Sequence, residues 1–371
     1  MLFSERLEAA GRRPSGFDYL RLILASAVIV SHSTNVVSGI EAAKALFFSF
    51  WRLPLIVILP AFFALSGFLV AGSLSRCPSL LGFVGLRVLR LVPALAVEVF
   101  MSALLIGPLL TSFTMRDYFS SPAFSAYFLN IVGIIQFTLP GLFLTNPWPE
   151  IVNTQLWTIP FELEAYMVLT LLALAGIARK RALFLAAAVL MQTGAALYRF
   201  THPEPLPLLV GGRLLVLCFI FGVTAYFYRD RILSNATIAI SSGILLAVLF
   251  YIPGGEYFIG APITYLTIYI GLFNPRRIRF FLSGDYSYGM YLYGFPVQQC
   301  LVALIPSLSV AGNAVLALAT AFVIAHFSWH LVEKRAMTLK KPLHALERAG
   351  LSQISQTPLG RRVARLIAAG A

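Results

Sequence analysis

The chain has 371 residues, of which 59% are hydrophobic and 12% are charged, and its mean hydropathy is +0.83. Soluble domains carry about 25% charged residues, so this composition excludes a soluble protein and predicts an integral membrane protein. The net charge of +13 does not indicate nucleic-acid binding, because the Lys and Arg residues lie in short clusters between apolar segments, as in the loops of membrane proteins.

Apolar segments follow one another along almost the whole chain. They lie at 17–36, 54–72, 82–110, 124–142, 158–178, 182–199, 208–227, 236–253, 257–273, 286–305 and 311–332. All basic clusters fall on the cytoplasmic side only if 124–142 does not cross the membrane. We therefore predict an all-α polytopic membrane protein with about ten transmembrane helices and both termini in the cytoplasm. Residues 118–156 are expected to form a re-entrant or interfacial excursion on the outer side, next to a cavity.

A single membrane domain at 17–335 is the simplest organisation, with 1–16 as a cytoplasmic N-terminus. Residues 336–371 form a basic tail, which suits either an amphipathic helix on the inner leaflet or disorder. Asp18 and Arg21 interrupt the first apolar run, which favours an uncleaved transmembrane helix over a signal peptide. No pair of matching interrupted helices is evident, which disfavours a secondary transporter.

The first apolar segment carries two ionisable residues, Arg21 and His32, with ten residues between them. On an α-helix this spacing is about three turns, so both side chains project from one face with a rise of roughly 16 Å. Ionisable groups at such depth are functional candidates, with ion-paired packing as the alternative. A neutral His32 beside a cavity suits a general base, whereas the structural alternative is a histidine hydrogen-bonded between helices. Asp18 is placed for a local ion pair with Arg21.

The third apolar segment begins with Arg87 and Arg90, and Pro93 follows one turn later. Two guanidinium groups three residues apart can bind phosphate bidentately, although anchoring of a cytoplasmic helix end explains the pair as well. In the second segment, Ser66-Gly67-Phe68 allows close helix packing. Glu98 is a mid-helix acid without an identifiable partner.

A helix is expected to follow the excursion, with Trp157 as an interfacial anchor. Glu162 and Glu164 lie near its outer end, roughly 200° apart, so only one can easily face a cavity. Glu162 would orient an imidazole, bind a hydroxyl, or simply favour the helix dipole. The tyrosines of 286–293, Tyr291 among them, form an aromatic belt or line an entrance. His326 and His330 share a face without a zinc-protease pattern, and the cysteines are scattered, so no metal site is predicted.

These features together resemble the acyltransferase 3 family of bacterial membrane acyltransferases, which modify surface polysaccharides and related glycans. The matching motifs run from residue 17 to residue 335. They are Phe-Asp-x-Leu-Arg with Arg-x10-His (Arg21, His32), Ser66-Gly67-Phe68, Arg87-x-x-Arg90 with Pro93, Leu156-Trp157-Thr158 leading to Glu162 and Tyr166, Ser287-Tyr288-x-x-Tyr291-Leu292, and Ser328 to Glu333. Two departures are Tyr293-Gly294, where relatives often carry a histidine, and Lys334-Arg335, where a proline usually follows the glutamate.

The resemblance implies that acyl-CoA, often acetyl-CoA, is the co-substrate and that no cofactor is permanently bound. It implies a glycan or lipid-linked sugar as acceptor, the lipid bilayer of the bacterial inner membrane as the location, and no nucleic-acid partner. We accordingly expect His32 and Glu162 to be catalytic. The expected donor-binding residues are Arg21, Arg87, Arg90 and Tyr291, and the expected acceptor-binding residues are Asp18, Ser66, Trp157 and Glu164.

Two other classes of function fit the same cavity. A transporter or flippase of a lipid-linked sugar would move the acceptor without consuming acyl-CoA. A non-catalytic membrane scaffold would need Arg21 and His32 for folding only. The sequence leaves open the acceptor glycan, the size of the acyl group, the oligomeric state, and whether His32 acts as a base or is itself acylated.

Overall fold

The computed structural model describes residues 1–77, 79–202, 211–340 and 342, and its regular structure is helical. The elements are α1 (Phe3–Ala9), α2 (Ser15–Phe47), α3 (Arg52–Ile56), α4 (Ile58–Leu74), α5 (Leu80–Met101), η1 (Ser102–Ile106), α6 (Gly107–Leu110), α7 (Met115–Ser120), α8 (Pro122–Tyr127), η2 (Phe128–Val132), η3 (Thr154–Thr158), α9 (Ile159–Leu174), η4 (Ile177–Arg179), α10 (Arg181–Thr201), α11 (Gly212–Phe227), α12 (Ala236–Leu249), η5 (Gly255–Phe258), α13 (Gly260–Gly271), α14 (Arg279–Leu282), α15 (Ser287–Leu304), α16 (Val310–Ser328), η6 (Trp329–Glu333), α17 (Lys334–Ala336) and η7 (Met337–Leu339).

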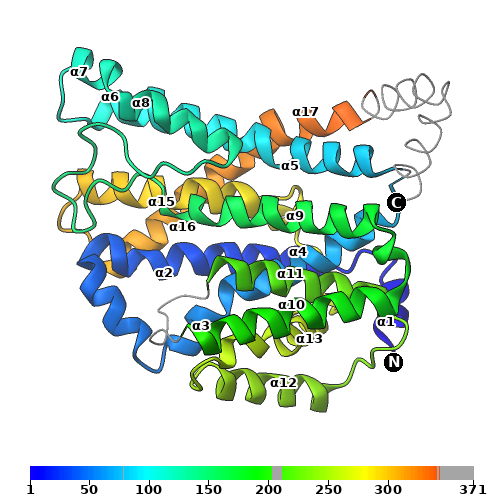
Figure 1. The fold of residues 1–371 in the computed structure, drawn as a ribbon. Coiled ribbons are helices and arrows are strands. Elements are labelled where there is room, and N and C mark those ends of the chain that lie inside the picture. The colour runs from blue at the N-terminus through cyan, green and yellow to red at the C-terminus, as the bar shows by residue number, and fades with distance from the viewer. Residues whose placement is uncertain (78, 203–210, 341, 343–371) are drawn as a thin grey trace.

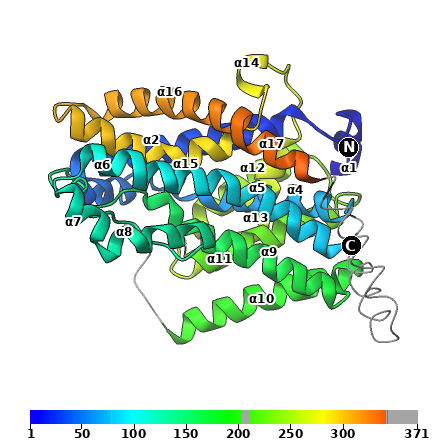
Figure 2. The ribbon, with the colours of Figure 1, turned by 90° about the horizontal axis from the view of Figure 1, so that it is seen from above.

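Six helices in the described ranges are long and apolar enough to cross a membrane: Ser15–Phe47, Arg52–Leu74, Leu80–Leu110, Thr154–Leu174, Arg181–Thr201 and Val310–Leu339. The shorter apolar helices α11 and α12 run beside them, as do α13 and α15 (Figures 1 and 2). This confirms the prediction of an all-α membrane protein. The count of ten crossings and the cytoplasmic position of the termini stay predictions. The amphipathic or disordered tail lies almost entirely outside the described residues.

Small residues set the close packing of α4 against α11. A Cβ atom on Gly67 would lie 2.0 Å from the carbonyl oxygen of Phe219, and one on Gly222 would lie 2.1 Å from that of Ala64. No larger side chain fits either position without moving the backbone of the partner helix. The packing interpretation of Gly67 is thus confirmed, and its neighbour Ser66 lines a cavity instead.

The predicted excursion contains no long helix in the structure. Helical structure ends at Val132, and the chain runs irregularly until η3 begins at Thr154. Amide side chains bind this segment to α15: Asn146 Nδ2 donates to Gln299 Oε1 at 2.7 Å, and Gln299 Nε2 donates to the carbonyl oxygens of Trp148 at 2.9 Å and Ile151 at 2.8 Å. The irregular backbone is therefore held by protein, as the bilayer requires.

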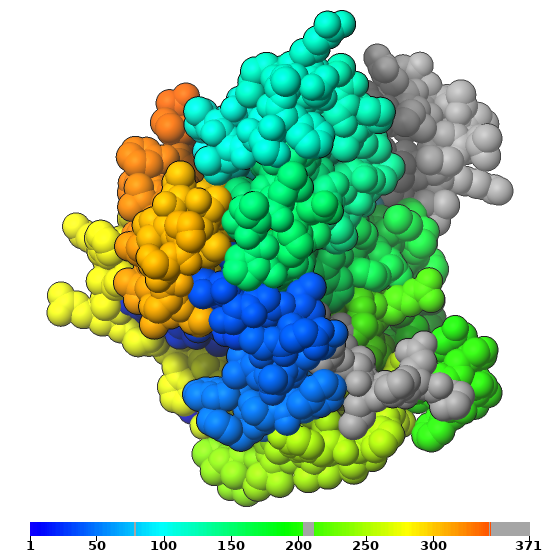
Figure 3. Space-filling model, turned by 90° about the vertical axis from the view of Figure 1, so that its left-hand side faces the viewer, coloured from blue at the N-terminus to red at the C-terminus, as the bar shows by residue number. Residues whose placement is uncertain are grey.

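The first helix is longer than the apolar segment 17–36 predicts. It continues to Phe47 across a kink at Gly39, whose φ of 82° is favourable only for glycine. The kink brings Gly39 against the carbonyl oxygen of Pro147 in the excursion. Figure 3 views this end of the bundle, where the excursion (cyan to green) meets the bent end of α2 (blue) and the turn between α15 and α16 (orange).

Candidate active site

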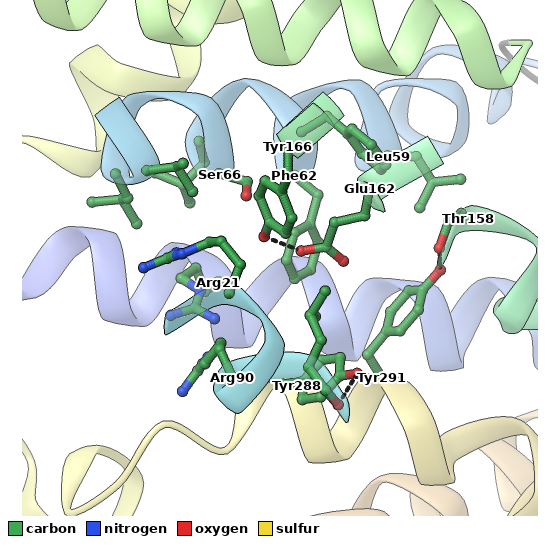
Figure 4. Close-up of a pocket in the computed structure, with 16 residues that line it drawn as sticks. Arg21, Leu59, Phe62, Ser66, Arg90, Thr158, Glu162, Tyr166, Tyr288 and Tyr291 are labelled. Atoms are coloured by element: carbon green, nitrogen blue, oxygen red, sulfur yellow. Dashed lines mark hydrogen bonds between the residues drawn. The ribbon is translucent and has the colours of Figure 1, made fainter. Parts of the chain in front are cut away.

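A cavity of about 140 Å³ lies among α2, α4, α5, α9 and α15, and we call it the arginine pocket. Its polar wall consists of Arg21, Arg87, Arg90, Ser66, Thr158, Glu162, Tyr166, Tyr288 and Tyr291. Arg21 and Arg90 lie on one side of the cavity, and Thr158 and Tyr291 lie on the other (Figure 4). The structure therefore gathers four residues expected to bind the donor, from three separate helices, around one space.

Asp285 connects two of the arginines. Its Oδ2 accepts hydrogen bonds from Arg21 Nη1 and Arg90 Nη2, and its Oδ1 accepts one from Ser287 Oγ at 2.8 Å. Arg90 Nη1 also lies 3.9 Å from Glu333 Oε2. Burial raises the pKa of Asp285, but the charges of Arg21 and Arg90 outweigh it and hold the pKa below its ordinary value. Asp285 is therefore a fixed counter-charge that orients both guanidinium groups.

Arg87 is held differently from the other two arginines. Its Nη2 donates to Ser73 Oγ at 3.0 Å, and its guanidinium group lies over the rings of Phe83 and Tyr166, 5.6 Å and 5.9 Å from their centroids. No acid in the described part of the chain lies within ion-pair distance of it. Arg87 is thus oriented by neutral groups, which leaves its charge available to an anion.

A second cavity, of about 470 Å³, lies next to the first, and we call it the histidine cavity. It is bounded by α2, the α3–α4 corner, the excursion and η3. The described residues that line it are Val28, Ser31, His32, Asn35, Phe47, Leu55, Ile58, Leu59, Phe137, Trp148, Thr154, Trp157, Gly211 and Tyr291. The His32 ring stands edge-on to Phe295 at 5.5 Å and lies 6.5 Å from the ring of Trp148.

Tyr291 and Leu59 line both cavities. The Tyr291 hydroxyl lies 2.6 Å from Thr158 Oγ1 and donates to the carbonyl oxygen of Gln155 at 3.0 Å. Gln155 Nε2 in turn donates to the carbonyl oxygen of Tyr291 at 2.8 Å. These bonds join α15 to η3 and fix the Tyr291 ring at the boundary between the two spaces.

The first helix supplies both cavities, as the spacing of Arg21 and His32 predicts. Arg21 lines the arginine pocket, and Val28, His32 and Asn35 line the histidine cavity farther along α2. Arg21, Val28 and Asn35 follow at intervals of seven residues, which keeps them close to one face of a helix. Trp157 also lines the histidine cavity.

Three expectations need correction. Asp18 does not pair with Arg21: it forms an ion pair with Arg277 at 2.9 Å and lines neither cavity. Glu162 does not orient His32, because it lines the arginine pocket and accepts a hydrogen bond from the Tyr166 hydroxyl at 2.5 Å. Glu164 also lines neither cavity, since it projects from another face of α9 than Glu162.

The most important residue that the sequence reasoning missed is Asp285. One signal was available, because Asp285 is the only acidic residue between Glu256 and Glu333, and it directly precedes the tyrosine-rich helix.

Glu98 does have partners: Ser102 Oγ and Asn153 Nδ2 each donate to its Oε1 at 2.9 Å. His326 and His330 lie beside the Tyr286 hydroxyl, and no metal-binding group of three or more ligands is found in the described ranges.

Comparison with known proteins identifies the family of this chain. A family profile described as an acyltransferase domain matches residues 15–330, a range that includes the helices around both cavities. An O-acetyl transferase of Shigella phage Sf6 is 28% identical over 352 residues, which cover 89% of this chain and 98% of that protein. No solved structure matches the chain. The chain therefore belongs to the acyltransferase 3 family and is a membrane acyltransferase.

Proposed function

We propose that this chain transfers an acyl group from cytoplasmic acyl-CoA to a hydroxyl of a cell-surface or lipid-linked glycan at the outer face of the bacterial inner membrane. One observation carries the proposal: a cavity with three arginines adjoins a cavity with a histidine, and the two share Leu59 and Tyr291. The phage relative described as an O-acetyl transferase supports acetyl as the transferred group.

The arginine pocket suits the phosphate groups of CoA. Guanidinium groups bind phosphate oxygens bidentately, and Arg87 has no acidic partner within the described residues. Arg21 and Arg90, oriented by Asp285, complete the positive wall. The acyl end of the donor would extend past Tyr291 to His32, a displacement of roughly 16 Å along α2 from the level of Arg21.

The histidine cavity suits a sugar acceptor. Trp148 and Trp157 offer aromatic surfaces, and polar side chains stand among them. His32 takes the proton of the acceptor hydroxyl, and the hydroxyl oxygen attacks the carbonyl carbon of the thioester. The carbon–sulfur bond then breaks, the imidazolium returns its proton to the thiolate, and the products are an ester and free CoA.

Substitution of His32 tests the proposal directly. Purified protein in nanodiscs is given labelled acetyl-CoA and the glycan-lipid fraction of host membranes, and acylated glycan is measured by mass spectrometry. His32→Gln and His32→Ala should lower the rate by about 10²- to 10⁴-fold, the usual contribution of a general base, with an unchanged KM for acetyl-CoA. Transfer at the wild-type rate would refute the assignment of His32. Translocation of the acceptor without consumption of acetyl-CoA would instead indicate a flippase.

A further inference from the structure

In the transfer reaction proposed above, a negative charge develops that His32, as the base, does not stabilise. When the hydroxyl oxygen attacks the thioester, the carbonyl oxygen becomes an oxyanion. Acyl-transfer enzymes place hydrogen-bond donors where this charge develops, and removal of one such donor typically lowers kcat by about 10²- to 10³-fold. A donor near His32 is therefore required by the chemistry, and it must belong to the wall of the histidine cavity.

Asn35 has the position that this role requires. It lies three residues after His32 on α2, so the two side chains are neighbours on the helix surface, with about 5–6 Å between their Cβ atoms. Both side chains line the histidine cavity. The thioester carbonyl oxygen is bonded to the carbon under attack, so it lies close to the hydroxyl that His32 deprotonates. A donor one helical turn from His32 is therefore within reach of this carbonyl oxygen.

The hydrogen bonding of Asn35 points to a ligand. Its donor, Nδ2, makes no hydrogen bond with another described residue, and its acceptor, Oδ1, is buried without a hydrogen-bond partner. The nearby Ser31 hydroxyl, by contrast, donates to the carbonyl oxygen of Val28 at 2.8 Å. The donors of other amides in the protein are used: Asn146 Nδ2 and Asn153 Nδ2 each donate to two acceptors, although Asn153 Oδ1 is buried without a partner like that of Asn35. An amide donor that the protein leaves unused in the wall of a cavity is available to an acceptor atom of a bound molecule.

We infer that Asn35 is a catalytic residue whose side-chain amide donates a hydrogen bond to the oxyanion formed on the thioester carbonyl. This inference rests on the proposed function. In the step, the acceptor oxygen forms a bond to the carbonyl carbon while its proton passes to His32. The carbonyl π electrons move to the oxygen beside Asn35 Nδ2, and they return when the carbon–sulfur bond breaks and the thiolate takes the proton.

The experiment compares two reactions of the same protein in nanodiscs. One is transfer from acetyl-CoA to the host glycan-lipid fraction, and the other is the slow hydrolysis of acetyl-CoA without acceptor, measured as released thiol. An oxyanion donor serves both reactions, because water and sugar hydroxyl attack the same carbonyl. Asn35→Ala should lower kcat of both by about 10²- to 10³-fold and leave KM for acetyl-CoA within about twofold of wild type.

Asn35→Asp is the second variant, because it keeps the size of the side chain but replaces the donor amide with acceptor oxygens. It should lose at least as much activity as Asn35→Ala. Thr34→Ala, on the same turn of α2 but outside both cavities, is the control and should retain wild-type rates. Thermal unfolding in detergent checks that all variants are folded.

Each other outcome would overturn the inference. Wild-type rates in both Asn35 variants would exclude a role in the chemistry. A raised KM for the acceptor with unchanged hydrolysis would make Asn35 part of acceptor binding instead. If the wild-type protein consumes no acetyl-CoA at all, the proposed function fails first, and this outcome is distinguishable because it does not depend on Asn35.

Discussion

The two cavities adjoin each other and yet are built from opposite kinds of residues. In the arginine pocket, Arg21 and Arg90 are bound to Asp285, and Arg90 also faces Glu333. The histidine cavity is more than three times as large, and none of the described residues that line it is Asp, Glu, Lys or Arg. Its polar groups are instead an imidazole, an amide and hydroxyls among aromatic rings.

Under the proposed function, this difference separates the recognition of the donor from the recognition of the acceptor. A polyanion such as the phosphates of CoA needs fixed positive charges, and Asp285 holds two of them, Arg21 and Arg90, in the empty state. An uncharged sugar needs hydrogen-bond partners and an aromatic surface, which carry no such cost. We therefore expect substitutions in the arginine pocket to change stability and donor binding, and substitutions in the histidine cavity to change kcat.

The largest effect on stability is expected from Asp285→Ala. It leaves two partly buried guanidinium groups without their shared acid, which should lower the free energy of unfolding by about 3 kcal/mol. Because the pKa of Asp285 is lowered in the folded protein, this stabilisation is complete above the ordinary pKa of aspartate and is lost only as the pH falls below it, so pH 7 reports it in full. Thermal unfolding in detergent measures the change.

The matched control is Asp18→Ala, which breaks an ion pair whose arginine, Arg277, has 41% of its side chain exposed. Exposed pairs contribute about 0–1 kcal/mol, so the melting temperature should change little. Saturating CoA should restore part of the stability lost in Asp285→Ala, since phosphate oxygens would replace the acid. Equal stability losses in the two variants would refute the expectation that the ion pairs of Asp285 contribute more stability than the exposed ion pair of Asp18.

Arg87→Ala should affect the donor rather than the fold. Because no acid in the described ranges lies within ion-pair distance of Arg87, its removal breaks no ion pair. The loss of a charge-assisted hydrogen bond of about 1.5–3 kcal/mol predicts a rise in KM for acetyl-CoA of roughly 10- to 100-fold. Arg87→Lys should recover only part of this, since an ammonium group lacks the planar fork. An unchanged KM would show that the phosphates bind elsewhere.

Helical spacing accounts for what could be predicted about the site. The alignment of Arg21 with His32 follows from α-helical geometry alone, as does the choice of one face between Glu162 and Glu164. The amides that hold the excursion are not predictable from the sequence. The absence of a long helix within it agrees with the prediction that 124–142 does not cross the membrane, and Asn130, Gln136 and Pro140-Gly141 interrupt that apolar run. The relative positions of residues on one helix, and the interruption of an apolar run, can therefore be predicted without a structure.

Contacts between residues of different helices cannot be predicted in the same way. Spacing permits an ion pair between Asp18 and Arg21, yet Asp285, 264 residues from Arg21, takes its place. Glu162 lies level with the arginines rather than with His32, because the axial offset of α9 against α2 depends on packing that periodicity does not encode. The partners of charged groups in a helical bundle are a tertiary property, and here they decide which pocket each residue serves.

The smallest effect is expected from Tyr291→Phe, which tests where the boundary between the cavities lies. The sequence-based expectation was that Tyr291 binds the donor, and in that case loss of its hydroxyl should raise KM for acetyl-CoA by roughly tenfold. The hydroxyl is instead occupied by Thr158 and the carbonyl of Gln155. We therefore expect KM to change less than about threefold. The free energy of unfolding should fall by no more than about 1 kcal/mol, because Thr158 Oγ1 keeps its hydrogen bond to the carbonyl oxygen of Gln155 at 3.2 Å. A tenfold rise in KM would instead show that the Tyr291 hydroxyl binds the donor directly.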